Sequence, residues 1–185
     1  MGVTDWKEWS DAVAAGVRGV PDEALALAAA TLSAASLVLT AGNGGSAALA
    51  SHAAQALMKP GYEAGGGRAA ICLTDSVPAL TAHANDGGWS KSFVELGRPF
   101  LRDNFGVALW LFSSSGSSAN VVALAELARQ HYRPIVAFTG FGGEPLKSLA
   151  TVSAHVDSRD YEVVEPVHDA LLHRVQYHLR ARKLK

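Results

Sequence analysis

The sequence predicts an α/β protein built around a parallel β-sheet. Short segments that are apolar throughout alternate along the chain with longer segments of helical pattern. Continuously apolar strands are typical of parallel sheets, because helices cover both faces of such a sheet. The chain has 185 residues, of which 49% are hydrophobic, enough for one domain with a substantial core. We therefore expect a three-layer αβα sandwich around a five-stranded parallel sheet.

Two helices are expected before the sheet begins, within residues 1–33. Thr4 is a suitable N-cap for the first helix, whose apolar stripe carries Trp6 and Trp9. Pro21 suits the first turn of the second helix, and two acidic residues follow it. The apolar stripe with Trp6 and Trp9 predicts that the first helix packs either within the chain or against another copy of it.

Five strands, each followed by a helix, are expected in the rest of the chain. The strands are expected at 36–40, 69–73, 106–112, 134–138 and 151–156. The helices are expected at about 46–58, 75–84, 118–131, 144–150 and 162–182. Neither an internal repeat nor a low-complexity linker divides the sequence, so residues 1–185 should form a single domain.

The charge and composition argue against several classes of protein. The formal net charge is -1, and no basic cluster is large enough to indicate a nucleic-acid ligand. No apolar stretch reaches membrane-spanning length, and the N-terminus lacks the apolar segment of a signal peptide. The single cysteine, Cys72, lies in an apolar run and is expected in the core. We expect a soluble, cytoplasmic protein.

A glycine-rich loop follows the first expected strand, with the sequence G-N-G-G-S over 42–46. In parallel sheets, ligands bind beyond the carboxyl ends of the strands, where helix N-termini present free N–H groups. The glycines allow close approach of the backbone, and Ser46 should both cap the next helix and offer a hydroxyl. The spacing matches neither a dinucleotide-binding G-x-G-x-x-G nor a Walker loop.

A serine-rich loop, S-S-S-G-S-S-A-N over 113–120, follows the third expected strand. It supplies hydroxyl and backbone donors without a fixed charge. Either loop alone could be an ordinary strand-to-helix turn. The presence of both at neighbouring strand ends favours a shared phosphate-binding seat.

Together, these loops and three further motifs resemble the SIS (sugar isomerase) domain family. The similarity runs from about residue 35 to residue 180 and indicates the branch of phosphoheptose isomerase and the DnaA initiator-associating protein. The motifs that carry it are G-N-G-G-S (42–46), T-D-S (74–76) with A-N-D (84–86), S-S-S-G-S-S-A-N-V (113–121), T-G-F-G-G (139–143) and E-P-V-H-D-A-L-L-H (165–173).

The resemblance implies a binding site for a sugar phosphate of the heptose 7-phosphate class. Asn43 would shape the first loop, and Asp86 would contact sugar hydroxyls. The resemblance also implies a homotetramer with sites at subunit interfaces, with residues 1–33 serving oligomerisation and residues 34–185 forming the αβα core. The phosphate would be held by the hydroxyls of Ser46, Ser113, Ser114, Ser115 and Ser118.

The catalytic groups of the family are matched only in part. Aldose–ketose isomerisation needs a base for a carbon-bound proton and an acid or base for the sugar oxygens. In phosphoheptose isomerases these are a glutamate on the helix after the first loop and a histidine on the last helix. His173 matches the histidine, and His52 matches another on the first of these helices, but Ala56 stands where the glutamate is expected.

Three interpretations of Ala56 remain open. Another carboxylate could serve as base, with Glu165 the first candidate and Glu162 the second; some family members bind zinc, and here His52, Glu165 and His173 would be its ligands. Alternatively, catalysis is lost and a non-catalytic adaptor or regulator remains, as in the DnaA-associating relative. The third interpretation is an isomerase for another phosphosugar. We favour a sedoheptulose 7-phosphate isomerase with His173 and Glu165 as catalytic residues.

Overall fold

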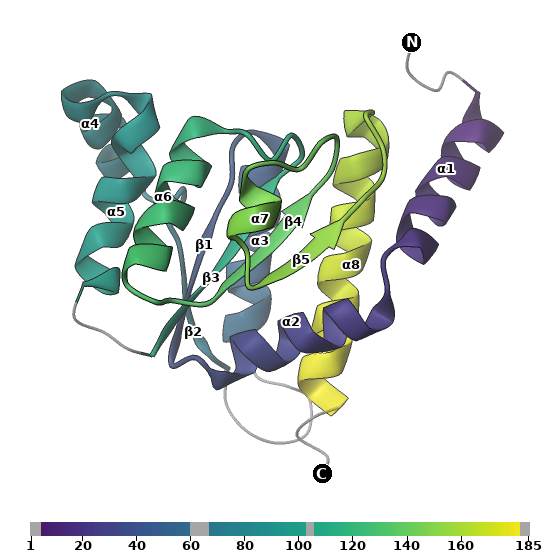
Figure 1. Ribbon diagram of the computed structural model, residues 1–185, viewed down its shortest axis with the longest axis horizontal. Coiled ribbons are helices and arrows are strands. Elements are labelled where there is room, and N and C mark those ends of the chain that lie inside the picture. Colours follow the sequence, from purple (N-terminus) through teal and green to yellow (C-terminus); the bar gives the residue numbers. More distant parts are fainter. Residues whose placement is uncertain (1–4, 60–66, 103–105, 182–185) are drawn as a thin grey trace.

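The computed structural model describes residues 5–59, 67–102 and 106–181. Its centre is a five-stranded sheet with strand order β2-β1-β3-β4-β5, and every neighbouring pair is parallel. Helices cover both faces of this sheet, which confirms the three-layer αβα fold (Figure 1). The strands are β1 (Leu37–Ala41), β2 (Ala69–Cys72), β3 (Val107–Ser113), β4 (Ile135–Thr139) and β5 (Val152–His155).

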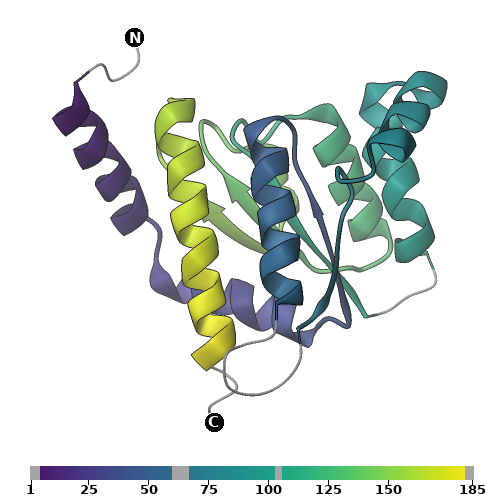
Figure 2. The same ribbon diagram turned by 180° about the vertical axis from the view of Figure 1, so that it is seen from behind.

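The helices divide between the two faces of the sheet. Helices α2, α3 and α8 share one core with it, and α5, α6 and α7 share the other. Figure 2 shows α3 and α8 side by side on one face. The helices are α1 (Trp6–Gly19), α2 (Asp22–Ala34), α3 (Gly45–Met58), α4 (Val77–Gly87), α5 (Ser92–Leu101), α6 (Ala119–Gln130), α7 (Leu146–Leu149) and α8 (Tyr161–Ala181), with a short 3₁₀ turn at Trp89–Lys91.

The central strand β3 is buried along its whole length. Because successive strand side chains point to opposite faces, Trp110 and Phe112 enter the core beneath α2, α3 and α8. Leu109 and Leu111 enter the core on the other side. Full burial of each such side chain contributes about 1.5–3 kcal/mol, which explains why apolar strands dominate the sequence pattern.

Helix α5 is an element that the sequence patterns did not predict. Gly97 and Pro99 resemble helix breakers, yet both lie inside this helix; Pro99 is near its C-terminal end, where its missing N–H removes one i→i−4 hydrogen bond. Gly97 allows close packing against α6, because a Cβ there would lie 2.6 Å from Cδ1 of Leu124. The spacing of four between buried Phe93, Gly97 and Leu101 is the signal that could have identified this helix.

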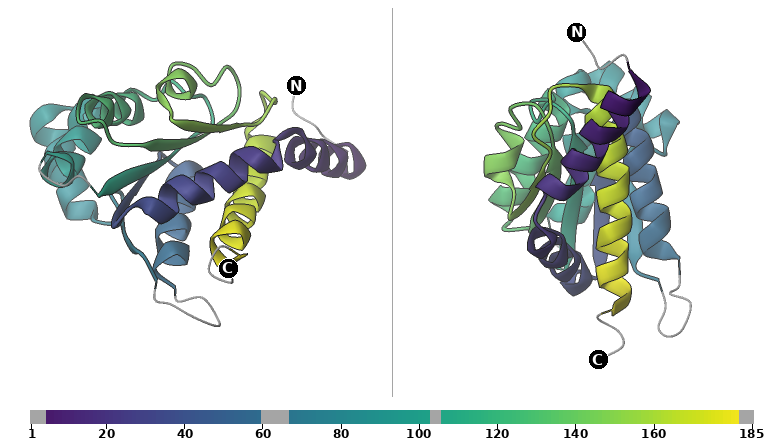
Figure 3. Two further views of the ribbon diagram at one scale, coloured as in Figure 1. Left: turned by 60° about the horizontal axis from the view of Figure 1, so that its bottom comes forward. Right: turned by 90° about the vertical axis from the view of Figure 1, so that its right-hand side faces the viewer.

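Helix α1 lies along α8 at the edge of the molecule (Figure 3). Asp5 is its N-cap and accepts hydrogen bonds from the backbone amides of Lys7 and Glu8, whereas Thr4, the expected cap, lies outside the described residues. Trp9 donates from Nε1 to the backbone oxygen of Glu162 over 2.9 Å. Trp6 stacks on Trp9 with 5.0 Å between ring centroids and is 76% exposed, so only part of the tryptophan stripe packs within the chain.

Helix α2 is joined to the far end of α8 by one carboxylate. Asp22 accepts two hydrogen bonds of 2.7 Å from the guanidinium of Arg174, and its carboxylate lies 2.9 Å from Nε2 of His178. The hydrogen bonds from Arg174, followed by the one with His178, hold the pKa of Asp22 well below its usual range. These contacts of Asp22 with Arg174 and His178 therefore link helix α2 to helix α8.

The strand order reverses between β1 and β3, and this reversal brings the loops after the two strands together. Ala41 at the end of β1 pairs with Leu111 near the end of β3, so the two loops that follow emerge side by side. Such a switch point is the usual position of ligands in open α/β sheets. None of the helices in the described parts of the chain is long and apolar enough to cross a membrane.

Candidate functional site

The glycine-rich and serine-rich loops are tied together by a pair of amide side chains. Nδ2 of Asn43 donates to Oδ1 of Asn120 over 2.8 Å, and Nδ2 of Asn120 donates back to Asn43 over 2.9 Å. Asn120 is fully buried, and its Oδ1 also accepts from the backbone N–H of Val121. Asn43 therefore fixes the position of the first loop against the start of α6.

Helix α3 begins without a side-chain cap, and the expectation that Ser46 caps it is wrong. The N-cap is Gly44, whose φ of 56° turns the chain so that the helix starts at Gly45 and Ser46 falls inside its first turn. Gly42 lies so close to the Ser46 backbone that a Cβ there would overlap it. Since no side chain occupies the cap, the first N–H groups of α3 stay available to a ligand.

The serine loop presents hydroxyls that are only partly used within the protein. The Ser113 and Ser118 hydroxyls lie 3.3 Å apart, and the Ser115 hydroxyl accepts from the backbone N–H of Ser117. The Ser114 hydroxyl is buried and has no hydrogen-bond partner among the described residues. Helix α6 also lacks a side-chain cap. A buried donor without a partner beside two uncapped helix N-termini fits an anion such as phosphate.

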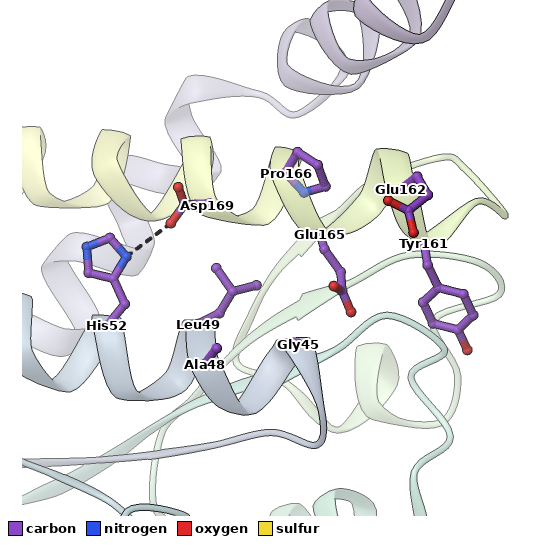
Figure 4. A pocket seen from close by; sticks show the side chains of 9 residues that line it. All are labelled: Gly45, Ala48, Leu49, His52, Tyr161, Glu162, Glu165, Pro166 and Asp169. Carbon is purple, nitrogen blue, oxygen red and sulfur yellow. Dashed lines mark hydrogen bonds and ion pairs between the residues drawn. The ribbon is translucent and has the colours of Figure 1, made fainter. Parts of the chain in front are cut away.

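An open groove of about 410 Å³ runs between α3 and α8 (Figure 4). Gly45 lines it at one end, so the groove adjoins the glycine-rich loop. Tyr161, Glu165 and Asp169 contribute from every fourth position of α8 and lie on the stripe that faces α3. The full lining consists of Gly45, Ala48, Leu49, His52, Tyr161, Glu162, Glu165, Pro166 and Asp169.

Glu165 lies at the loop end of the groove. Its carboxylate is against Gly45, where a Cβ would overlap it, and Figure 4 shows it directed toward α3. Burial raises the pKa of Glu165, and the nearby charge of Glu162 adds to the effect. A carboxylate with a raised pKa is a better proton acceptor near neutral pH than an ordinary glutamate.

Farther along the groove, its lining residues His52 and Asp169 meet His173, which is not part of the lining. Nδ1 of His52 lies 3.0 Å from Oδ1 of Asp169, and the rings of His52 and His173 meet edge to face with centroids 5.1 Å apart. A ligand atom from each of the three side chains lies within 4.8 Å of the other two. Glu165, which we expected beside the two histidines, is not in this group; Asp169 is.

Two other polar side chains lie elsewhere. Asp86, the expected sugar contact, is exposed near the end of α4, accepts from Nδ2 of Asn85, and does not line the groove. His168 is fully buried, and its Nε2 lies 3.1 Å from the backbone oxygen of Thr139. Burial lowers the pKa of His168 to about 4, so it is neutral at physiological pH.

A comparison with known protein families identifies this arrangement. The SIS domain family matches residues 13–140, more than half of the chain. The chain belongs to the SIS domain family. Its five-stranded sheet and the two loops at the switch point are the part of this SIS domain that positions the groove.

Individual relatives place this SIS domain in the phosphoheptose isomerase branch. It is 32% identical to the phosphoheptose isomerase of Rhodospirillum rubrum over 155 residues, 82% of this chain and 79% of that protein. It is 36% identical to the lincomycin biosynthesis protein LmbN of Streptomyces lincolnensis over 140 residues, 72% of this chain but 50% of that protein. The solved phosphoheptose isomerase of Neisseria gonorrhoeae matches with a TM-score of 0.85 at 26% identity, covering 95% of both chains.

Asp169 is the site residue that the sequence motifs did not identify. Residues 165, 169 and 173 are spaced by four, so all three lie on one stripe of a single helix. This spacing was visible in E-P-V-H-D-A-L-L-H and could have placed Asp169 between Glu165 and His173. Two imidazoles and one carboxylate also form a donor set that suits a catalytic zinc ion, so the residues present fit such a metal.

Proposed function

We propose that this SIS domain is a cytoplasmic phosphosugar isomerase that interconverts an aldose and a ketose of the heptose 7-phosphate class. The single observation that carries the proposal is the position of Gly45. It belongs to the glycine-rich loop and also lines the groove that holds Glu165, Asp169 and His52. A phosphate bound at the two loops would thus place its sugar beside ionisable groups.

The phosphate seat would be formed by the start of α3, the start of α6 and the serine hydroxyls. Neutral donors and helix N-termini stabilise a phosphate without a basic side chain, which agrees with the balanced charge of the chain. The buried Ser114 hydroxyl has no hydrogen-bond partner among the described residues, and a bound phosphate would supply one. The seat comprises Ser46, Ser113, Ser114, Ser115 and Ser118, with Asn43 holding the loops together and Asp86 proposed to contact the sugar.

The reaction would be a proton transfer between adjacent sugar carbons. Glu165 would take the proton from the carbon next to the carbonyl, giving an enediol, and return it to the neighbouring carbon. The raised pKa of Glu165, caused first by burial, suits this role. In the metal-free protein His173 would carry the proton between the two sugar oxygens. When zinc is bound, the metal would instead polarise those oxygens.

The relatives support an isomerase rather than the adaptor alternative. The proteins from Rhodospirillum rubrum and Neisseria gonorrhoeae are named phosphoheptose isomerases. Ala56 cannot act as the base that the family has at this position, and Glu165 supplies a carboxylate in the groove between α3 and α8.

We also propose a homotetramer assembled through residues 1–33, supported by the exposed Trp6 on α1. Sedimentation of the wild type and of Trp6→Ala would test this assembly.

The function is tested by incubating the protein with sedoheptulose 7-phosphate in deuterated water. We expect product formation and deuterium uptake at the reacting carbon, both greatly reduced in Glu165→Gln. Phosphosugar binding without turnover or exchange would refute the isomerase proposal.

The phosphate seat is tested separately through its buried hydroxyl. Ser114→Ala removes a donor that has no partner in the described protein, so folding should be unaffected while phosphosugar affinity falls by about 1.5–3 kcal/mol, the range for a hydrogen bond to a charged group. Ser153→Ala is the matched control, because Ser153 is another buried, unpartnered hydroxyl but lies on β5. Equal affinities of the two variants would contradict the seat.

A further inference from the structure

We propose that Asp169 completes a divalent-metal centre with His52 and His173, and that Glu165 stays outside it. The carboxylate ligand then comes from α8, opposite the position on α3 where Ala56 has no ligand atom to offer. The inference rests on the proposed function only in placing a sugar beside the metal. It assigns separate tasks to two acids that stand one helical turn apart.

The positions of the three ligand atoms support a shared ion. His52 and Asp169 already contact each other over 3.0 Å across the groove, and His173 reaches the same point from the next turn of α8. Around a tetrahedral zinc ion, ligand atoms about 2.1 Å from the metal lie about 3.4 Å from one another. The three atoms here lie within 4.8 Å, so side-chain rotation alone can close the remaining gap.

These side chains are partly exposed, which leaves room for that rotation and for a fourth ligand. The side chains of His52 and Asp169 are 36% and 47% exposed, and His173 is also exposed. A site with three protein ligands and an open face is the arrangement of catalytic zinc, in which water or substrate takes the fourth position. Two neutral imidazoles and one carboxylate leave a net positive charge on the bound ion, which would attract sugar oxygens.

Glu165 is excluded from the centre by where its carboxylate lies. It stands against Gly45, at the loop end of the groove, whereas Asp169 is one turn farther along α8 and contacts His52. The ligand atoms of His52, Asp169 and His173 lie within 4.8 Å of one another, and the Glu165 carboxylate is not part of this group. Glu165 therefore remains free to accept a proton.

Metal binding is measured directly, without relying on turnover. The untagged full chain is titrated with Co²⁺, whose visible absorption reports the ligand geometry, and with Zn²⁺ by calorimetry. We expect one ion per chain. Asp169→Ala should weaken binding by more than about 100-fold, because loss of an outer-shell partner alone costs about 10- to 100-fold. Glu165→Gln, the matched control on the same helix stripe, should bind with wild-type affinity and unchanged Co²⁺ absorption.

The outcomes separate this inference from the proposed function. Failure of the wild type to bind either ion, or wild-type affinity in Asp169→Ala, would overturn the metal centre. Loss of binding in Glu165→Gln equal to that in Asp169→Ala would overturn the division between the two acids. Inorganic phosphate binding by each variant verifies that the loops are intact. If the metal-free protein turns over sedoheptulose 7-phosphate, the isomerase proposal holds even when the metal centre is refuted.

Discussion

The buried histidine on α8 makes the stability of the protein depend on pH. His168 has no exposed surface, and burial lowers its pKa from the ordinary 6.5 to about 4, with the hydrogen bond to the Thr139 oxygen opposing the shift. Below pH 6.5 the unfolded chain binds a proton that the folded chain does not. The free energy of unfolding must therefore fall as the pH drops from 6.5 toward 4. From about pH 7.5 to about pH 4.5, His168 alone should remove about 2.5 kcal/mol.

The measurement is urea unfolding followed by circular dichroism at both pH values and one protein concentration. His168→Gln is the comparison, because a glutamine amide can donate to the same oxygen but does not titrate. The other histidines and the carboxylates titrate in both proteins, so the difference between the two pH-dependent losses isolates His168. A difference below about 1 kcal/mol would refute the buried neutral state. NMR titration of the wild-type imidazole gives a second measure if the variant does not fold.

Three further substitutions test contacts that position the site. Asn43→Ala should lower the free energy of unfolding by about 1–3 kcal/mol, because it leaves the buried Nδ2 of Asn120 without an acceptor; urea unfolding measures this. Gly97→Ala should lower the melting temperature, because its Cβ would press on Leu124 and overpacking costs about 1–3 kcal/mol. Asp22→Asn should lower the free energy of unfolding near neutral pH but much less in acid. The pKa of Asp22 is lower in the folded protein than its ordinary value of 3.8, so the charged carboxylate stabilises the fold above pH 3.8. This stabilisation is lost as the pH falls below 3.8. Urea unfolding of both proteins across that range would contradict this if the difference did not shrink.

The fold could be predicted from the sequence because its strands are buried on both faces. Each of the five apolar runs became a strand whose bounds lie within one residue of those expected. Helix α5 escaped prediction because its pattern contains Gly97 and Pro99, whose effect depends on tertiary packing and position rather than on local preference. The cap of α3 was mispredicted for a similar reason, since a glycine with positive φ replaced the expected serine.

The site could be predicted at the level of loops but not of individual contacts. Chain order and the parallel sheet were enough to bring the glycine and serine loops together. The contact between His52 and Asp169 joins residues that are far apart in sequence, and it depends on how α3 and α8 are rotated. Sequence spacing fixed which residues share the stripe on α8. It did not fix which of Glu165 and Asp169 lies against the histidines.

The reciprocal amide pair between Asn43 and Asn120 has a consequence for how a ligand is captured. It holds the glycine-rich loop and the start of α6 together before anything binds. An incoming phosphate would then meet preorganised donors from both loops at once and would spend little of its interaction energy on ordering them. Association should accordingly follow a single bimolecular step, with no slower phase of loop closure, and differences in affinity among phosphosugars should arise along the groove rather than at the phosphate.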